Sequence, residues 1–258
     1  MKITRSLSFS RISFVSFASF AVRLGLVFAG AMAGAAAACD KPVYLTLDTG
    51  GMQSAELIAD ILKKHDVRAT FFIANEKTYR GDRSLDESWA PYWKARAAEG
   101  HAFGSHTWRH WYFRQDADDG RVAYVARGGQ QKELLDRDGV CRELKQPGAA
   151  FKAMTGRELD PLWRAPGGRT TPRTLEYAKA CGFARHVGWA DAGFLGDELP
   201  SDRYPNDALL QRALKNVRAG DVLMMHLGIW SRQEPFAPML DPLIAGLKAR
   251  GFCFRTLS

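Results

Sequence analysis

The sequence of 258 residues lacks the patterns that mark several common functional classes. It contains only four cysteines and no Cys-x-x-Cys pair, which argues against a zinc knuckle or a thioredoxin-like redox site. It contains no run of lysines and arginines, so we predict no nucleic-acid-binding groove. It also shows no internal repeat and no low-complexity linker. These absences favour one globular domain that does not bind nucleic acid.

Charge is sparse at the N-terminus. The charged residues that precede Asp40 are Lys2, Arg5, Arg11 and Arg23. An apolar, alanine-rich run then leads to Ala38, and this order is typical of a secretory signal peptide. The run is short and alanine-rich for a membrane-spanning helix. We therefore predict a signal peptide over residues 1–38, no membrane span in the mature chain, and export to the periplasm or the medium.

The four cysteines of the predicted mature chain are Cys39, Cys141, Cys181 and Cys253. Cys39 follows the expected cleavage site directly, so a lipid-anchored form at Cys39 is an alternative to a freely exported one. An even number of cysteines in an exported protein is compatible with disulfides, but the sequence does not fix their pairing. Cys39 precedes the first predicted strand and Cys253 lies in the last, so a bridge between them is possible in a closed barrel.

The mature domain is only mildly basic. Removal of the four positive charges of residues 1–38 lowers the net charge from +8 to +4. Such a domain carries no strong electrostatic signature for a polyanionic partner, although a basic rim would help it on an anionic polymer.

Predicted strands and helices alternate along the mature chain, judged from apolar β-rich runs and from apolar residues at helical spacing. The expected strands cover residues 43–47, 68–74, 101–105, 162–164, 183–189, 221–225 and 252–257. The expected helices cover residues 53–64, 87–99, 141–155, 172–180, 207–218 and 238–250, and residues 111–140 are expected to be mostly loop with a short helix. This alternation indicates an α/β fold with a mostly parallel sheet, and at this length a barrel that forms one domain over residues 39–258.

Ionisable residues of catalytic types follow five of the predicted strands. They are Asp48, His106 with His110, Arg164, Asp191 and His226. In a parallel barrel these strand ends lie on one face, so the positions together favour an active site. Each also has a structural interpretation: a turn cap for Asp48, an ion pair for Arg164, a loop cap for Asp191 and a buried, backbone-bonded ring for His226.

His106 and His110 are four residues apart, just past the expected strand 101–105. On one helical turn, side chains at that spacing project from the same face, and imidazole is the commonest protein ligand for a metal ion. The pair predicts a divalent metal site, although two ligands alone do not complete one. The alternative is two surface or capping histidines.

Five short segments resemble, in order, the five motifs of the polysaccharide deacetylase family, also known as carbohydrate esterase family 4 or the NodB-homology domain. The segments are residues 46–50 (Thr-Leu-Asp-Thr-Gly), 106–110 (His-Thr-Trp-Arg-His), 164–168 (Arg-Ala-Pro-Gly-Gly), 189–191 (Trp-Ala-Asp) and 223–226 (Leu-Met-Met-His). The ordered set covers nearly the whole mature chain. The resemblance implies a distorted (β/α) barrel of about seven mostly parallel strands, which agrees with the alternation above.

The resemblance also implies catalytic roles. Asp48 would be the general base, and Arg164 would orient it and tune its charge. His226 would be the general acid that protonates the leaving amine. Asp191, in the loosely matched fourth motif, would tune His226.

The remaining motif residues would bind the metal ion and the substrate. His106 and His110 take the metal-ligand positions, and zinc is the expected ion. Pro166, Gly167 and Trp189 take substrate-binding positions, with Gly167 standing where the third motif of the family has an aromatic residue.

The first motif departs from the family at the residue after Asp48. The family has a second aspartate there, its third metal ligand, whereas this chain has Thr49. A neutral hydroxyl is a poor replacement for a carboxylate on such a cation. Three outcomes follow: weaker metal binding through two histidines, waters and substrate; recruitment of Asp48 as a ligand; or an empty site in a sugar-binding relic. We favour the first, because the base, its arginine and the acid all remain.

The resemblance implies a metal-dependent hydrolase that removes N-acetyl groups from a cell-wall or secreted polysaccharide containing N-acetylglucosamine, and releases acetate. Its partner would be that polysaccharide or peptidoglycan, and we expect a monomer. Trp108, Trp111 and Tyr112 beside the histidine pair would either stack on sugar rings or pack against the barrel rim. The alternatives are a catalytically weak or inactive carbohydrate-binding barrel and a metal-assisted hydrolase of another amide or an ester.

Overall fold

The computed structural model describes residues 39–257, so the predicted signal peptide over residues 1–38 lies outside the described residues. The described residues belong to one compact unit. The strands of its main sheet are β1 (Pro42–Asp48), β2 (Thr70–Ile73), β3 (Ala102–Ser105), β7 (Leu162–Trp163), β8 (Arg185–His186), β9 (Val222–His226) and β10 (Cys253–Phe254). The sheet order is β10-β1-β2-β3-β7-β8, with β9 also paired to β1, and every pairing is parallel.

The sheet curls but is open between β8 and β9. β8 and β9 are not paired with each other, and a single bridge joins Phe194, which follows η3, to Met224 of β9. The central strands β1, β2 and β3 are buried, as expected for parallel strands covered on both faces. The prediction of a distorted barrel of about seven parallel strands is therefore confirmed.

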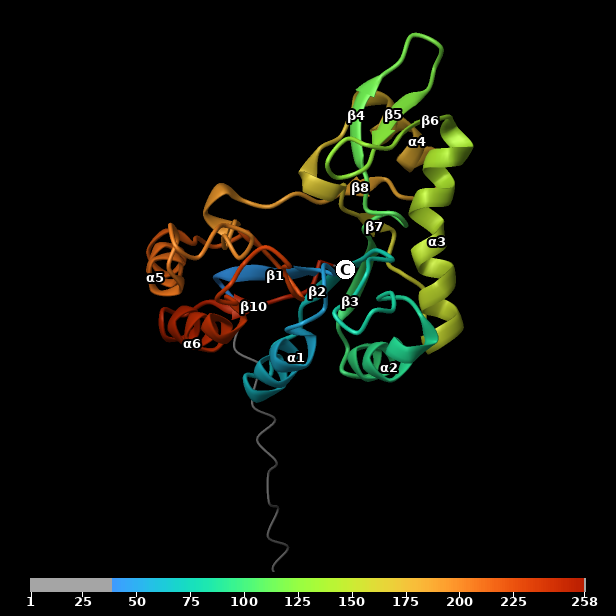
Figure 1. Ribbon diagram of the computed structural model, residues 1–258. Helices are drawn as coiled ribbons and strands as arrows, with labels where there is room; N and C mark the ends of the chain where they lie inside the picture. The colour runs from blue at the N-terminus through green and yellow to red at the C-terminus, as the bar shows by residue number, and fades with distance from the viewer. Residues whose placement is uncertain (1–38, 258) are drawn as a thin grey trace, which may run out of the picture. The chain divides into compact units, whose positions relative to one another are not determined.

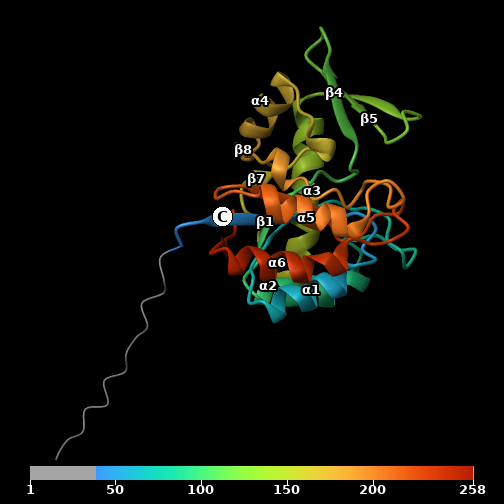
Figure 2. The same ribbon diagram turned by 90° about the vertical axis from the view of Figure 1, so that its left-hand side faces the viewer.

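Helices lie along the outer side of the sheet (Figures 1 and 2). They are α1 (Ala55–Lys64), α2 (Ala90–Ala98), α3 (Arg137–Thr155), α4 (Pro172–Ala180), α5 (Asn206–Asn216) and α6 (Leu240–Ala249). Short 3-10 turns are η1 (Glu87–Trp89), η2 (Pro166–Gly168), η3 (Asp191–Gly193) and η4 (Ala237–Met239). Helix α1 packs on α6 and α6 on α5, while α2 packs on α3 and α3 on α4. Each helix lies within a few residues of its expected range, because each has an apolar face at helical spacing.

Residues 111–140 differ from the prediction of mostly loop with a short helix. They form a three-stranded antiparallel sheet of β4 (Tyr112–Asp116), β5 (Val122–Val125) and β6 (Lys132–Leu135), followed at once by α3. The turns between these strands contain Gly120 at φ 87° and Gly128 at φ 90°. Asp119-Gly120 is a common pair in hairpin turns. The strands themselves are too short to be recognised from their sequence, but this pair indicated a hairpin between residues 112 and 125. In Figure 1 this sheet stands beside the upper end of α3.

Apolar packing holds the small sheet against the barrel. Phe113, Tyr124 and Leu135 pack with Leu144 of α3 and with Trp163 of β7 in one buried cluster. The small sheet β4–β6 therefore packs against β7, the strand that directly precedes Arg164.

Two disulfides pair all four cysteines. Cys39 pairs with Cys253 over a Cα–Cα distance of 6.0 Å, and Cys141 pairs with Cys181 over 5.5 Å. The bridge between Cys39 and Cys253 is the one that the sequence suggested. A cysteine in this disulfide has no thiol left for a lipid anchor, so the anchored alternative at Cys39 excludes this bridge. No helix within residues 39–257 combines the length and the apolar character needed to cross a membrane.

Candidate active site

The ends of four parallel strands bring the predicted catalytic residues together. Asp48 ends β1 and His226 ends β9, and the two are register partners on neighbouring strands. His106 follows β3, and Arg164 follows β7, where the Arg164 backbone N–H donates to the carbonyl of Ser105 (2.9 Å). The sequence-based expectation that these strand ends share one face therefore corresponds to the observed arrangement.

Asp48 and Arg164 form a buried ion pair. Arg164 is 0% exposed, and its Nη1 donates to Asp48 Oδ1 (2.7 Å) and to Thr46 Oγ1 (2.9 Å). Its Nε and Nη2 donate to the carbonyls of Val187 and Gly188, each at 3.0 Å. Burial alone would raise the pKa of Asp48, but Arg164 and two nearby imidazoles outweigh burial and lower it. Asp48 is therefore an ionised carboxylate with a fixed orientation at neutral pH.

His106 and His110 face each other without a helix. The chain after β3 is irregular, and Thr107 (φ 64°) and His110 (φ 56°) adopt left-handed backbone conformations. The expected helical turn is thus wrong, yet the two Nε2 atoms lie 3.1 Å apart. His106 Nδ1 donates to the carbonyl of Arg164 (2.8 Å), and burial lowers the His106 pKa to about 4, so the ring is neutral and Nε2 is available as a ligand.

A buried carboxylate from α3 holds this strained turn. Glu143 accepts from the backbone N–H groups of Trp108 (3.2 Å) and Arg109 (3.0 Å), from Arg109 Nε (2.6 Å) and from the Tyr124 hydroxyl (2.9 Å). Glu143 thus accepts hydrogen bonds from backbone N–H groups that would donate to backbone carbonyls in a helix. They explain how two non-glycine residues remain at positive φ.

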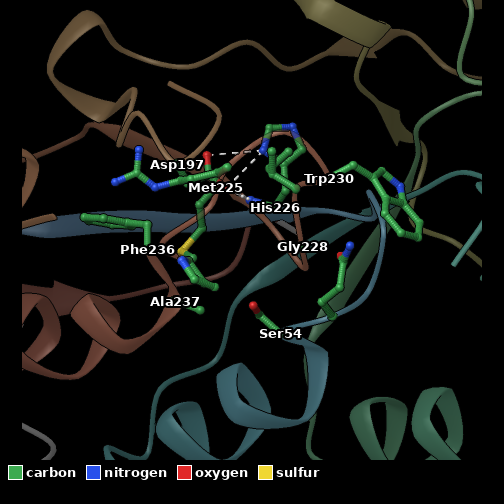
Figure 3. Close-up of a pocket in the computed structure, with 12 residues that line it drawn as sticks. Ser54, Asp197, Met225, His226, Gly228, Trp230, Phe236 and Ala237 are labelled. Atoms are coloured by element: carbon green, nitrogen blue, oxygen red, sulfur yellow. Dashed lines mark hydrogen bonds and ion pairs between the residues drawn. The ribbon is translucent and has the colours of Figure 1, made fainter. Parts of the chain in front are cut away.

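The carboxylate beside His226 is Asp197, not Asp191. Asp197 Oδ2 accepts from the His226 backbone N–H (2.6 Å), and both of its oxygens lie 3.2 Å from His226 Nδ1. Figure 3 shows Asp197 directed at this edge of the ring. Burial would lower the pKa of His226, but Asp197 and Asp48 raise it to about 9. His226 is therefore protonated at neutral pH, as a general acid must be.

Asp191 lies elsewhere. It is exposed at the start of η3 and borders a different cavity together with Arg212 and Arg218. Asp197, and not the predicted Asp191, therefore contacts His226. The chain turns at η3 just after Asp191 and then runs back toward β9, where the Leu195 backbone N–H donates to the carbonyl of Met224 (3.3 Å).

Glu76 is a site residue that the sequence interpretation missed. Its Oε2 accepts from Thr49 Oγ1 (2.7 Å) and from the Gly50 backbone N–H (2.7 Å), and its Oε1 lies 3.4 Å from His110 Nδ1. Burial would raise the pKa of Glu76, but His110 and the Thr49 hydrogen bond lower it. Glu76 stands three residues after the end of β2, so a wider search after each strand would have found it.

These groups border a narrow cavity of about 60 Å³. Its lining includes the polar residues Asp48, Glu76, His106, His110 and His226 and the residues Tyr112, Gly167, Trp189 and Trp230. Of the three predicted substrate-binding residues, Gly167 and Trp189 line this cavity, whereas Pro166 is buried beside Gly167 at the start of η2.

Two further aromatic residues border this cavity: Tyr112, which the sequence indicated, and Trp230, which it did not. Tyr112 lies where a side chain at Gly167 would begin, because a Cβ atom there would be 2.9 Å from Tyr112 Cε1. Trp230 is 57% exposed and borders both this cavity and a second one of about 170 Å³ beside His226 (Figure 3). Of the other two predicted stacking residues, Trp108 packs on the main core and Trp111 on the β4–β6 cluster.

The donor set fits a divalent cation only in part. Within residues 39–257 no three His, Cys, Asp or Glu side chains are arranged as a ready metal site. Two nitrogen ligands on one zinc ion at about 2.0–2.1 Å lie roughly 3.3 Å apart in tetrahedral geometry, close to the separation of the two Nε2 atoms. Asp48 Oδ2 lies 3.4 Å from His106 Nε2. His106 and His110 are therefore the two side chains that would hold the ion.

Comparison with known proteins gives a consistent result. The family model described as polysaccharide deacetylase matches residues 35–186. The peptidoglycan-N-acetylglucosamine deacetylase of Bacillus cereus is 23% identical over 230 residues, which are 85% of this chain and 87% of that protein. The chitooligosaccharide deacetylase of Sinorhizobium fredii is 25% identical over 225 residues, which are 83% of this chain and 89% of that protein.

A solved structure shares the fold. It is a pseudoenzyme of carbohydrate esterase family 4 from Bacillus anthracis, with a TM-score of 0.62 and 22% identity. The alignment covers 84% of this chain and 64% of that one.

Proposed function

Because this chain belongs to the polysaccharide deacetylase family, we propose that it hydrolyses N-acetyl groups on an N-acetylglucosamine-containing polysaccharide and releases acetate. One observation carries the proposal: an ionised carboxylate, Asp48, and a protonated imidazole, His226, end neighbouring strands and border one cavity. Hydrolysis of an amide needs such a base and such an acid together. The two named relatives act on peptidoglycan N-acetylglucosamine and on chitooligosaccharides, which supports this substrate class.

The residues divide the reaction between them. Asp48 accepts a proton from the water that attacks the acetyl carbonyl, while Arg164 keeps its carboxylate in place. Attack of the water forms the new C–O bond and gives a tetrahedral intermediate. This intermediate collapses with cleavage of the C–N bond, and His226 gives its proton to the departing sugar nitrogen. A divalent ion, when bound at His106 and His110, would polarise the acetyl carbonyl. The expected ion is zinc, which two imidazoles suit.

Export remains part of the proposal. The positively charged start and the alanine-rich run of residues 1–38 support a signal peptide, and a cell-wall polymer is found outside the cytoplasmic membrane. We propose a periplasmic or secreted monomer with residues 39–258 as its single domain. The disulfides support an oxidising compartment.

The competing function is a sugar-binding barrel without catalysis. Two observations favour testing it: Thr49 replaces an aspartate of the first motif, and one protein of the same fold is a pseudoenzyme. This alternative predicts binding of N-acetylglucosamine oligomers without release of acetate.

Acetate release from N-acetylglucosamine oligomers tests the proposal. We expect activity in the zinc-loaded protein, its loss after chelation, and its return when zinc is added back. Asp48→Asn keeps the size of the side chain but removes the base, and it should lower kcat by about 10²- to 10⁴-fold. Activity that survives both chelation and Asp48→Asn would rule out this mechanism, and binding without any acetate release would favour the sugar-binding barrel.

A further inference from the structure

Glu76 is a half-buried carboxylate beside the histidine pair, and both of its oxygens have polar neighbours. One oxygen, Oε2, is held by the Thr49 hydroxyl and by the Gly50 backbone N–H, each at 2.7 Å. The other, Oε1, lies 3.4 Å from His110 Nδ1. The Glu76 side chain is 20% exposed and borders the same cavity as Asp48 and His106. Nothing in the general-base and general-acid chemistry uses this group.

Both imidazoles of the pair present Nδ1 to an acceptor. A backbone carbonyl, that of Arg164, accepts from His106 Nδ1 (2.8 Å), so this nitrogen carries a hydrogen. A carboxylate faces His110 Nδ1, which favours a hydrogen there as well. The atoms left to bind a cation are then the two Nε2 atoms, 3.1 Å apart. A metal-bound histidine commonly has its other nitrogen on a carboxylate or carbonyl in this way.

Thr49, which stands in place of the aspartate of the first motif, hydrogen-bonds to Glu76 and to the segment after β2. Its hydroxyl donates to Glu76 and accepts from the backbone N–H of Ala74 (3.2 Å). Ala74 and Glu76 belong to the segment that follows β2, next to the end of β1. The threonine thus ties the loop after β2 to the first motif and fixes the direction of the Glu76 carboxylate.

We propose that Glu76 is the positioning carboxylate of the metal pair: it orients His110 through Nδ1 and supplies, from the loop after β2, the negative charge that Thr49 does not carry. The inference rests on the proposed function, since it concerns the ion that His106 and His110 would hold. It explains how the first motif can lose an aspartate while Asp48 keeps its hydrogen bond to Arg164 and its role as base.

Zinc affinity of the purified protein tests this role without reference to activity. The protein is stripped with a chelator, and the dissociation constant for zinc is measured by competition with a chromophoric chelator. Glu76→Gln keeps the size and an acceptor but removes the charge, and it should weaken zinc binding by about 10- to 100-fold. The matched control is Glu198→Gln, which removes a carboxylate from the lining of the same cavity but has no contact with His110, and it should bind zinc within about twofold of wild type.

A second pair of variants separates charge from packing. Thr49→Asp in the Glu76→Gln background returns a carboxylate to the first motif, and it should recover most of the lost zinc affinity. Thr49→Val removes the hydroxyl that holds Glu76 and should weaken zinc binding less than Glu76→Gln does. Thermal unfolding of the metal-free variants checks that each is folded.

The outcomes distinguish this inference from the proposed function. If a folded Glu76→Gln variant binds zinc as tightly as wild type while the wild type still releases acetate, only the role of Glu76 is overturned. If the wild type binds no zinc even at saturating supply, both the role of Glu76 and the metal in the proposed function are overturned.

Discussion

Two buried groups of the site, Asp48 and His226, are held in opposite charge states by their neighbours. Burial disfavours the charge on each of them. Arg164 overrides burial at Asp48 and lowers its pKa, while Asp197 overrides burial at His226 and raises its pKa to about 9. A base that stays ionised and an acid that stays protonated can therefore coexist across the neutral range.

The pH profile should depend on Asp197. The proposed mechanism requires protonated His226, so activity should be present at neutral pH and be lost as the pH rises through about 9. Asp197→Asn removes the charge that raises the pKa of His226, so the alkaline limb should move toward the ordinary value of about 6.5. At pH 7.5 about a tenth of the rings would then be protonated, and kcat should fall about tenfold. The measurement is kcat for acetate release as a function of pH.

Asp191→Asn is the control for this prediction. Asp191 is exposed and borders another cavity, so its loss should leave the alkaline limb in place. A shift of that limb in Asp191→Asn together with an unshifted limb in Asp197→Asn would contradict the assignment of Asp197.

Among the elements, the small antiparallel sheet β4–β6 completes the cavity wall. The third motif has Gly167 in place of an aromatic residue, and Tyr112 of β4 lies against that glycine. Gly167 also has a φ of 62°, which disfavours any residue with a side chain. An aromatic ring has thus been provided from an inserted strand and not from the motif itself.

Substitutions at Gly167 and Tyr112, made singly and together, test whether the Tyr112 ring occupies the space beside Gly167. Gly167→Tyr should lower the free energy of unfolding by about 2–4 kcal/mol, the sum of a left-handed backbone at a non-glycine residue and overpacking against Tyr112. In a Tyr112→Ala background the same substitution should cost only about 1–2 kcal/mol, because the ring it meets is gone. Urea unfolding of the four proteins gives the comparison. An equal cost in both backgrounds would show that Tyr112 does not occupy this space.

Tyr112→Ala should also affect the substrate. The ring borders the cavity but carries no proton that the reaction needs, so we expect KM to rise several-fold, about 1 kcal/mol of lost contact, with a smaller change in kcat. Steady-state kinetics on N-acetylglucosamine oligomers measures the split. A large fall in kcat with an unchanged KM would instead indicate a role in the chemical step.

At the scale of the molecule, covalent bonds join distant parts of the chain. The bridge between Cys39 and Cys253 connects the segment before β1 to β10, over a sequence separation of 214 residues. The bridge between Cys141 and Cys181 ties α3 to the end of α4, over a separation of 40. Both restrict the unfolded chain, which is the main way in which disulfides stabilise proteins.

Loss of the longer bridge should destabilise the protein without changing its chemistry. We expect a Cys39→Ser/Cys253→Ser double variant to lose about 2–5 kcal/mol of folding free energy, seen as a lower Tm in calorimetry. The bridge lies at the start of β1, where Cys253 pairs with Pro42, whereas Asp48 and the rest of the site lie at the opposite ends of the strands. The value of kcat at low temperature should therefore stay near that of the wild type. An unchanged Tm in the double variant would contradict a structural role for this bridge.

The sequence alone determined the alternation of strands and helices, and through it the shared edge where Asp48, His106, Arg164 and His226 meet. This was possible because hydrophobic period reveals each element, and parallel strands place their carboxyl ends on one face. The same four residues belong to the ordered motifs by which the sequence was found to resemble the family.

Only the tertiary structure decided which groups assist them. Glu76, Asp197 and Tyr112 reach the site from two loops and an inserted sheet, and their positions depend on the path of segments that have no hydrophobic period. The turn at His106–His110 is irregular for the same reason. Its backbone N–H groups at Trp108 and Arg109 donate to Glu143 of α3, which follows His110 by 33 residues in the sequence. Local pattern fixes where a strand ends, whereas the contacts of a loop are fixed by the packing of everything around it.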